Sequence, residues 1–270
     1  AGPRGQRRAT LGPPRSLLKQ PQIHPGRALL DSLSQLRAHP WVVLGFTASL
    51  FGLHLLGWTV FGLGDGVSNA VLGVLLYGLG VSLYAVSLIW LIDGLTRAGL
   101  DLSRGRVPQA RSLYRWHGAC SWHLTRGVLR LTAALSLIVL MSFLSWSFLL
   151  LVAQPLAPLP LVLGVVLGGG LALSQLFNAC LVVAEGLGAT KAFRAGFVLL
   201  EHQGPGLIAL AGVLLAITVL PFALGLLSEL LWDGSGLPVT CVVVVPALCL
   251  MATTVTNSYV QWRRIRRGAR

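Results

Sequence analysis

Hydrophobic and polar positions divide the chain into six long apolar stretches separated by polar connections. A helix needs about 20 predominantly apolar residues to cross about 30 Å of hydrocarbon. The stretches are continuous rather than alternating, which favours helices over the strands of a membrane barrel. We therefore predict an all-α, six-helix transmembrane bundle, with spans near Trp41–Leu63, Val67–Ile92, Val128–Val152, Leu161–Ala184, Leu207–Leu231 and Pro238–Val260.

A short amphipathic segment precedes each odd-numbered span: Ala28–His39, Gln109–Gly118 and Gly188–His202. In the third segment, apolar residues gather on one helical face and charged residues around the other. We expect all three to form amphipathic interfacial helices. An apolar or aromatic residue followed by Arg recurs in them at near-equal intervals, which indicates either three copies of one unit or simply the charged connectors that any hairpin protein needs.

Composition excludes an ordinary soluble domain. Charged residues make up 11% of the chain and hydrophobic ones 54%, whereas a soluble domain carries about a quarter charged residues. The net charge of +13 lies in arms and loops that flank apolar spans, not on the folded basic face that a nucleic-acid binder needs. We predict that the partner is a lipid bilayer with an anionic inner leaflet, that other membrane proteins are candidate partners, and that nucleic acid is not.

The basic residues also predict an orientation. All 21 Lys and Arg residues fall in the N-terminal arm, the second and fourth connections with their span ends, and the C-terminal tail. The positive-inside rule then places both termini in the cytoplasm, most simply of a bacterial inner membrane. The predicted organisation is a basic, largely disordered arm over 1–40 that ends in the first amphipathic segment, a six-span domain over 41–260 and a basic tail over 261–270. Candidate contacts with the inner leaflet are Arg37, Arg115, Arg194, Arg263 and Arg264.

The second and fourth spans end alike, in Asp93-Gly94-Leu95 and Glu185-Gly186-Leu187. We expect these acids to pair with Arg97 or Lys191, or to cap the next helix. An acid-Gly-Leu motif followed by GATKAFRAGFVLLEHQG resembles the polytopic membrane domain found beside some glycerophosphodiester phosphodiesterases and its stand-alone bacterial relatives. The resemblance covers roughly Asp93 to Val260. It implies the six-span fold and a role near lipid, and it brings no catalytic residues.

No group of residues forms a catalytic signature. His117, Cys120 and His123 lie close in sequence, but zinc takes four protein ligands, or three and a water, and no fourth ligand is near them. Asp93 and Asp101 offer too few oxygens for a pair of hard cations. We therefore predict no enzymatic activity, no cofactor and no metal.

Polar residues inside the spans are the remaining candidates. Gln175 and Asn178 in the fourth span, and Thr253 and Asn257 in the sixth, should face the bundle because polar groups are costly against lipid. They would serve either as contacts between helices or as a candidate intramembrane cluster along a substrate path. We predict a lipid-associated or assembly factor; the alternative is a transporter of small solutes or lipids that uses these four residues.

Overall fold

The computed structural model describes residues 22–268, and within that range every regular element is a helix. Six of its helical segments are long and apolar enough to cross a membrane. The all-α, six-span prediction is therefore confirmed, and the chain is a multi-pass integral membrane protein. The α-helices are α1 (Pro25–Ala38), α2 (Pro40–Leu63), α3 (Ala70–Ser103), α4 (Ala110–Leu113), α5 (Gly118–Val152), α6 (Pro158–Ser174), α7 (Asn178–Glu185), α8 (Ala189–Leu231) and α9 (Gly236–Gly268).

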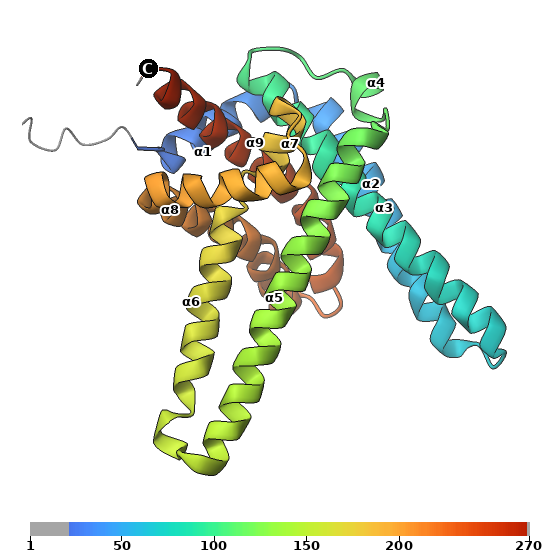
Figure 1. Cartoon of the computed structure of the whole chain (residues 1–270). Helices are drawn as coiled ribbons and strands as arrows, with labels where there is room; N and C mark the ends of the chain where they lie inside the picture. Colours follow the sequence, from blue (N-terminus) through green and yellow to red (C-terminus); the bar gives the residue numbers. More distant parts are fainter. Residues whose placement is uncertain (1–21, 269–270) are drawn as a thin grey trace, which may run out of the picture.

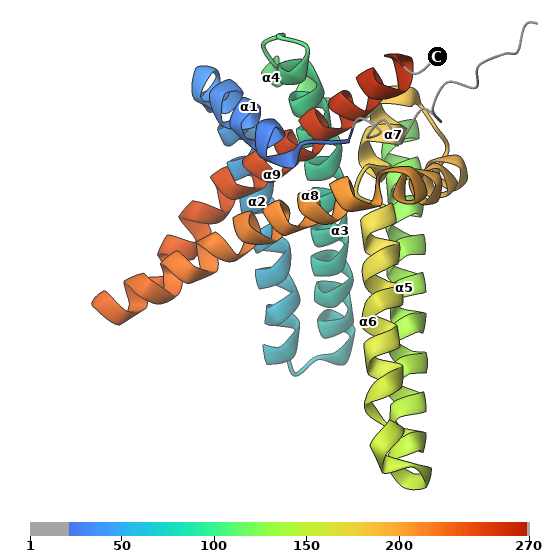
Figure 2. The same ribbon diagram turned by 90° about the vertical axis from the view of Figure 1, so that its left-hand side faces the viewer.

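Three helical hairpins extend from one polar end of the molecule, which we call the head (Figure 1). The hairpins are α2/α3, α5/α6 and the long parts of α8/α9, and the turned view in Figure 2 shows α8/α9 running obliquely to the other two. The head contains α1, α4, α7, the first part of α8 and the last part of α9. Both described ends of the chain lie there.

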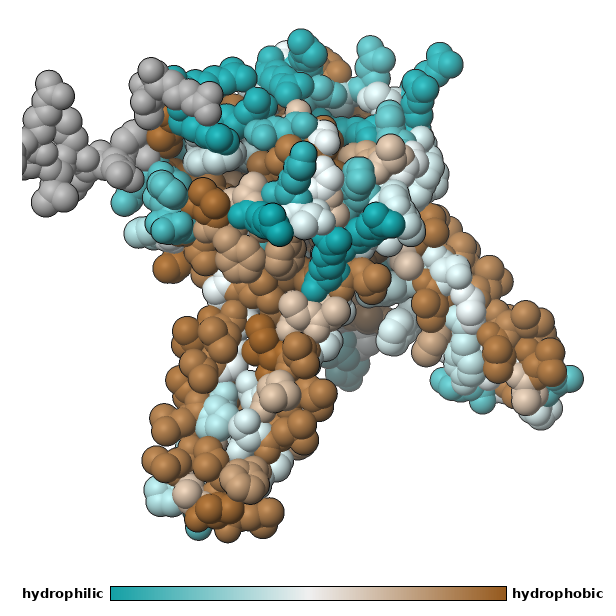
Figure 3. All heavy atoms as spheres, in the orientation of Figure 1, coloured by the Kyte–Doolittle hydropathy of each residue, from teal (hydrophilic) through white to brown (hydrophobic). Residues whose placement is uncertain are grey.

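Apolar side chains cover the hairpins, and hydrophilic ones gather on the head (Figure 3). The most apolar window of α5 has none of its residues buried inside the protein, and that of α6 and α7 only 11%. The two clusters of buried apolar residues lie nearer the head, one around Phe177 and Tyr259 and the other around Phe46 and Leu95. The hairpins thus expose their apolar surface to lipid, while tight packing is concentrated where they meet.

The amphipathic segments differ from one another in the structure. The first forms most of α1, but within Gln109–Gly118 only the single turn of α4 is helical before α5 begins. The third is continuous with the fifth span, and α8 bends at Gln203, which has non-helical dihedral angles (φ −129°, ψ 22°). Pro205 explains the bend, because its ring has no N–H to donate and clashes with the preceding turn. Pro221 lies in a regular part of the same helix.

The fourth span, predicted near Leu161–Ala184, lies within the candidate membrane span Gln154–Glu185, and its helix is interrupted. Helix α6 ends at Ser174, and two tight turns lead into α7 at Asn178. Helix α8 crosses directly against this break, because a Cβ atom on Gly196 would lie 2.2 Å from the Ser174 carbonyl oxygen. Only glycine permits so close a backbone approach. The break therefore lies at the point where α8 crosses the fourth span, after the glycines of α6.

Residues just before α1 are tied to the end of the chain. The Ile23 amide donates to Gln203 Oε1 (3.3 Å), at the bend of α8, and the His24 amide donates to Gln261 Oε1 of α9 (3.1 Å). The Ile23 side chain is buried and packs over Gly206. The start of α1 is thus held by the last two helices. Residues 1–21 of the predicted arm and residues 269–270 of the tail lie outside the described part of the chain.

Candidate functional site

A cavity with many polar lining residues lies in the head, between α3, α4, α5 and α7. It has a volume of about 890 Å³, and we call it the arginine hollow. Its floor is partly apolar, with Leu100 from α3 and Val182 and Val183 from α7. Its polar lining includes Arg97, Asp101, Arg104, Arg111, Arg115 and His117.

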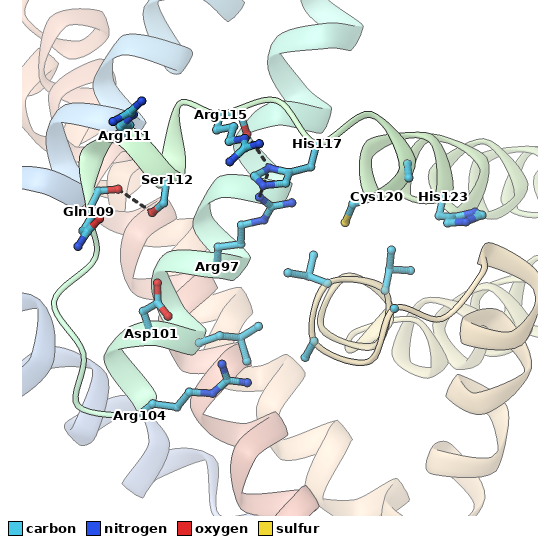
Figure 4. Close-up of a pocket in the computed structure, with 16 residues that line it drawn as sticks. Arg97, Asp101, Arg104, Gln109, Arg111, Ser112, Arg115, His117, Cys120 and His123 are labelled. Carbon is cyan, nitrogen blue, oxygen red and sulfur yellow. Dashed lines mark hydrogen bonds between the residues drawn. The ribbon is translucent and has the colours of Figure 1, made fainter.

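Two segments supply these charges. Positions 97, 101 and 104 fall on one face of α3, because residues spaced by about one and two turns lie above one another on a helix. Arg111 and Arg115 come from the turn of α4 and the connection after it. Figure 4 shows Arg97 and Arg115 close to the His117 ring, Asp101 and Arg104 further along α3, and Cys120 and His123 on the first turns of α5.

A buried ion pair fixes Arg97. Its Nη2 lies 2.9 Å from Asp93 Oδ2, and only 2% of the Asp93 side chain is exposed. The same guanidinium contacts His117, 2.8 Å from Nε2, while the Nδ1–H of His117 donates to the Arg115 carbonyl oxygen (2.7 Å). This imidazole therefore holds the α4–α5 connection against α3. The expected pairing of Asp93 with Arg97 is present.

The other arginines of the hollow differ from Arg97 because no described acid forms an ion pair with them. Within residues 22–268, Arg104, Arg111 and Arg115 form no salt bridge, and Asp101 is the single acid among the lining residues. With Arg97 compensated by Asp93, the hollow holds three guanidinium groups against one carboxylate. An arginine presents five N–H donors in a planar fork that matches phosphate and carboxylate geometry. The arrangement is suited to binding an anion.

A second cavity adjoins the first. It has a volume of about 330 Å³ and shares Leu100 and Arg104 with the arginine hollow. Its other basic residues are Arg263, Arg264 and Arg267 of α9, and we call it the tail hollow. Arg263 is held by Glu185 (Nε to Oε1, 3.6 Å), the acid that also accepts the Tyr259 hydroxyl (2.6 Å). Glu185 thus pairs with α9 and not with the expected Lys191.

The five predicted leaflet contacts are distributed over the head. Arg115 lines the arginine hollow, and Arg263 and Arg264 line the tail hollow. Arg37, in the last turn of α1, and Arg194, on the first part of α8, are exposed elsewhere on the head.

Sequence reasoning missed Arg97, Arg104 and Arg111 as members of a site. The spacing of Arg97 and Arg104 on one helical face was an available signal. No signal in the sequence indicates that Arg111 comes to lie near that face of α3.

The four predicted intramembrane polar residues do not share one set of hydrogen bonds. Asn178 Nδ2 donates to Gln175 Oε1 (2.7 Å), and Gln175 Nε2 donates to the Phe193 carbonyl (3.2 Å), so these two join α7, the break and α8. Asn257 Nδ2 instead donates to Ser32 Oγ of α1 (2.8 Å). Thr253 bonds within α9, to the Cys249 carbonyl. The amides therefore stabilise two different helix contacts, because α7 packs on α8 whereas α9 receives α1.

Two of the three candidate zinc ligands form other contacts in the structure. Cys120 Sγ donates to Asp93 Oδ1 (3.5 Å), and His117 is engaged by Arg97 and Arg115. Among the described residues, no three His, Cys, Asp or Glu side chains come together in a way that could hold a metal ion.

Comparison of the chain with known protein families, with curated proteins and with solved structures finds no match. The resemblance to the membrane domain beside glycerophosphodiester phosphodiesterases stays a prediction. We infer the function from the residues of the head.

Proposed function

We propose that the protein is a lipid-associated membrane protein that binds the phosphate of anionic phospholipids in the arginine hollow, and that this role is binding and not catalysis. The single observation that carries the proposal is the set of three guanidinium groups without a salt bridge to any described residue, Arg104, Arg111 and Arg115, around one cavity. Charge-assisted bonds from Arg to phosphate are about twice as strong as neutral ones.

The position of the hollow supports a lipid as the ligand. It lies in the head, the hydrophilic end of the molecule from which the apolar hairpins extend (Figure 3), and a hydrophilic end beside apolar spans is where lipid headgroups would be expected. Leu100, Val182 and Val183 provide an apolar floor beside the charged groups. A phospholipid presents this same combination, with a phosphate next to a glycerol backbone and acyl chains.

Lipid retention tests the proposal. The full chain is purified in mild detergent with phosphatidylglycerol or with phosphatidylcholine of the same acyl chains, and bound lipid is counted by native mass spectrometry. The variant Arg111→Gln/Arg115→Gln removes two charges from the hollow. The control Arg27→Gln/Arg37→Gln removes two charges from exposed positions of α1. We expect the hollow variant to bind phosphatidylglycerol about 30-fold more weakly, since each basic residue near an anionic surface contributes about 1 kcal/mol.

The control variant should retain phosphatidylglycerol as the unchanged chain does. Equal loss in the two variants would mean that the basic head attracts lipid only through its overall charge, and the proposal would fail. Phosphatidylcholine retained as well as phosphatidylglycerol would also overturn it.

We also propose that the head faces the cytoplasm of a bacterial inner membrane. The support is that the described basic residues gather in the head, while the α2–α3 and α8–α9 tips carry Asp65 and Asp233. The test introduces a single cysteine at Ser68 or at Ser112, in a chain without its four native cysteines, and treats spheroplasts with an impermeant maleimide. We expect labelling at Ser68→Cys, and at Ser112→Cys only after lysis; the reverse pattern would refute the orientation.

The transport alternative has no comparable support. Gln175, Asn178 and Asn257 hydrogen-bond to other protein groups, and neither hollow is lined by them. Solute or lipid flux through reconstituted vesicles that falls on replacing Asn178 or Asn257 would favour a transporter.

A further inference from the structure

The two hollows of the head share part of their lining. Leu100 and Arg104, one turn apart on α3, line both cavities. The arginine hollow lies on the side of α4 and α5, and the tail hollow lies on the side of α9. A ligand group bound in either hollow would therefore lie beside Arg104.

Each hollow has its own pair of arginines without an acidic partner. On one side these are Arg111 and Arg115; on the other they are Arg264 and Arg267, which form no salt bridge with residues 22–268. The lining of the tail hollow contains no acid among the described residues. All four of these side chains are exposed, so their N–H donors are accessible to an anion in either hollow.

The donors of Arg104 suffice for two anions. A guanidinium offers five N–H groups, and a bidentate contact with one phosphate uses two of them. Arg104 can therefore bind one phosphate on each side. Two linked phosphates would do so better than two separate lipids, because binding of the first makes binding of the second intramolecular.

We propose that the ligand of the head is a lipid with two linked phosphate groups, one in each hollow, with Arg104 between them. This proposal rests on the lipid binding proposed above and specifies the chemistry of the lipid. It assigns Arg264 and Arg267 to the second phosphate, and it gives α9 a direct part in recognition.

The experiment compares three variants of the full chain in detergent. Arg264→Gln/Arg267→Gln changes the tail hollow, Arg111→Gln/Arg115→Gln changes the arginine hollow, and Arg27→Gln/Arg37→Gln is the matched control. The probes are diphosphatidylglycerol, which has two phosphates joined by glycerol, and phosphatidylglycerol, which has one. Native mass spectrometry gives the number of lipids bound and their relative affinities.

We expect the unchanged chain to bind one diphosphatidylglycerol in competition with two phosphatidylglycerol molecules. The tail-hollow variant should lose about 30-fold in affinity for diphosphatidylglycerol, by the same charge arithmetic as above, while one phosphatidylglycerol still binds in the arginine hollow. The arginine-hollow variant should also lose about 30-fold in affinity for diphosphatidylglycerol, and it should lose the phosphatidylglycerol of the arginine hollow while one phosphatidylglycerol still binds in the tail hollow.

The two proposals fail in different ways. If the arginine-hollow variant binds both lipids as the control does, lipid binding itself is refuted. If that variant loses lipid but the tail-hollow variant keeps its preference for diphosphatidylglycerol, only the bis-phosphate ligand is refuted. Inorganic pyrophosphate is added as a soluble source of two linked phosphates. Undiminished lipid retention supports the lipid, whereas displacement of diphosphatidylglycerol by pyrophosphate would show that the site takes a soluble bis-phosphate and would overturn the lipid.

Discussion

Replacing either partner of the Asp93–Arg97 ion pair should destabilise the protein, and replacing both should cost less than the sum of the two single replacements. The two side chains are 2% and 18% exposed, with 2.9 Å between Asp93 Oδ2 and Arg97 Nη2. Removing one partner of a buried pair costs about 3–5 kcal/mol, because the remaining charge is left without compensation. Arg97 also contacts His117, so we expect Asp93→Asn to cost about 3 kcal/mol, at the lower end of that range.

The reverse change, Arg97→Met, should cost more than Asp93→Asn. It leaves a carboxylate that is almost wholly enclosed, with the Cys120 thiol as its remaining hydrogen-bond donor among the described residues. The double variant removes both charges and should recover about 1–3 kcal/mol relative to the sum of the single variants, which is the usual coupling energy of contacting groups.

Unfolding in mixed micelles with increasing sodium dodecyl sulfate measures these energies. The summed fluorescence of the eight tryptophans follows the transition, and it includes Trp90, which lies one turn before Asp93 and packs edge to face against Trp116 (ring centroids 5.8 Å apart). The reasoning would be refuted if each single variant cost less than about 1 kcal/mol, or if the single costs added to the double within about 0.5 kcal/mol.

Three further perturbations test the packing of the head. Gly196→Val should cost about 3 kcal/mol or more, because its Cβ has no room beside the broken fourth span, whereas Gly170→Val, with no atom within 4 Å of its Cβ, should change the unfolding midpoint far less. Asn257→Leu should cost about 1–2 kcal/mol through loss of the α1 contact, and hydrogen exchange should rise in α1 before it rises in α8; uniform exchange would contradict this. Tyr259→Phe removes the hydroxyl that donates to Glu185 and should cost about 1.5–3 kcal/mol in the same unfolding titration; an unchanged midpoint would show that this bond is not formed.

Hydropathy was enough to predict the six spans, because each apolar stretch must find lipid or protein over its whole length. It could not reveal the break at Gln175, since the residue that lies against the break, Gly196, is about 20 positions away on α8. The bend at Gln203 had a visible signal in Pro205. The distribution of charge predicted a basic head. The arginine hollow, however, depends on a tertiary contact that brings Arg111 and Arg115 near α3, and no local sequence pattern encodes this contact.

The attachment of α1 has a consequence for biosynthesis. Ile23 and His24 are held by Gln203 and Gln261, so the earliest described residues of the chain find their partners only after almost all of it has been made. During translation, each hairpin can enter the bilayer as it emerges, because its two helices are neighbours in the sequence. Until α9 has been made, the face of α1 that packs on α9 stays without its partner, and α1 stays at the membrane surface. We therefore expect folding to end with the packing of α1 on α9. A chain whose translation stops before α9 would be inserted in the membrane with α1 not yet packed.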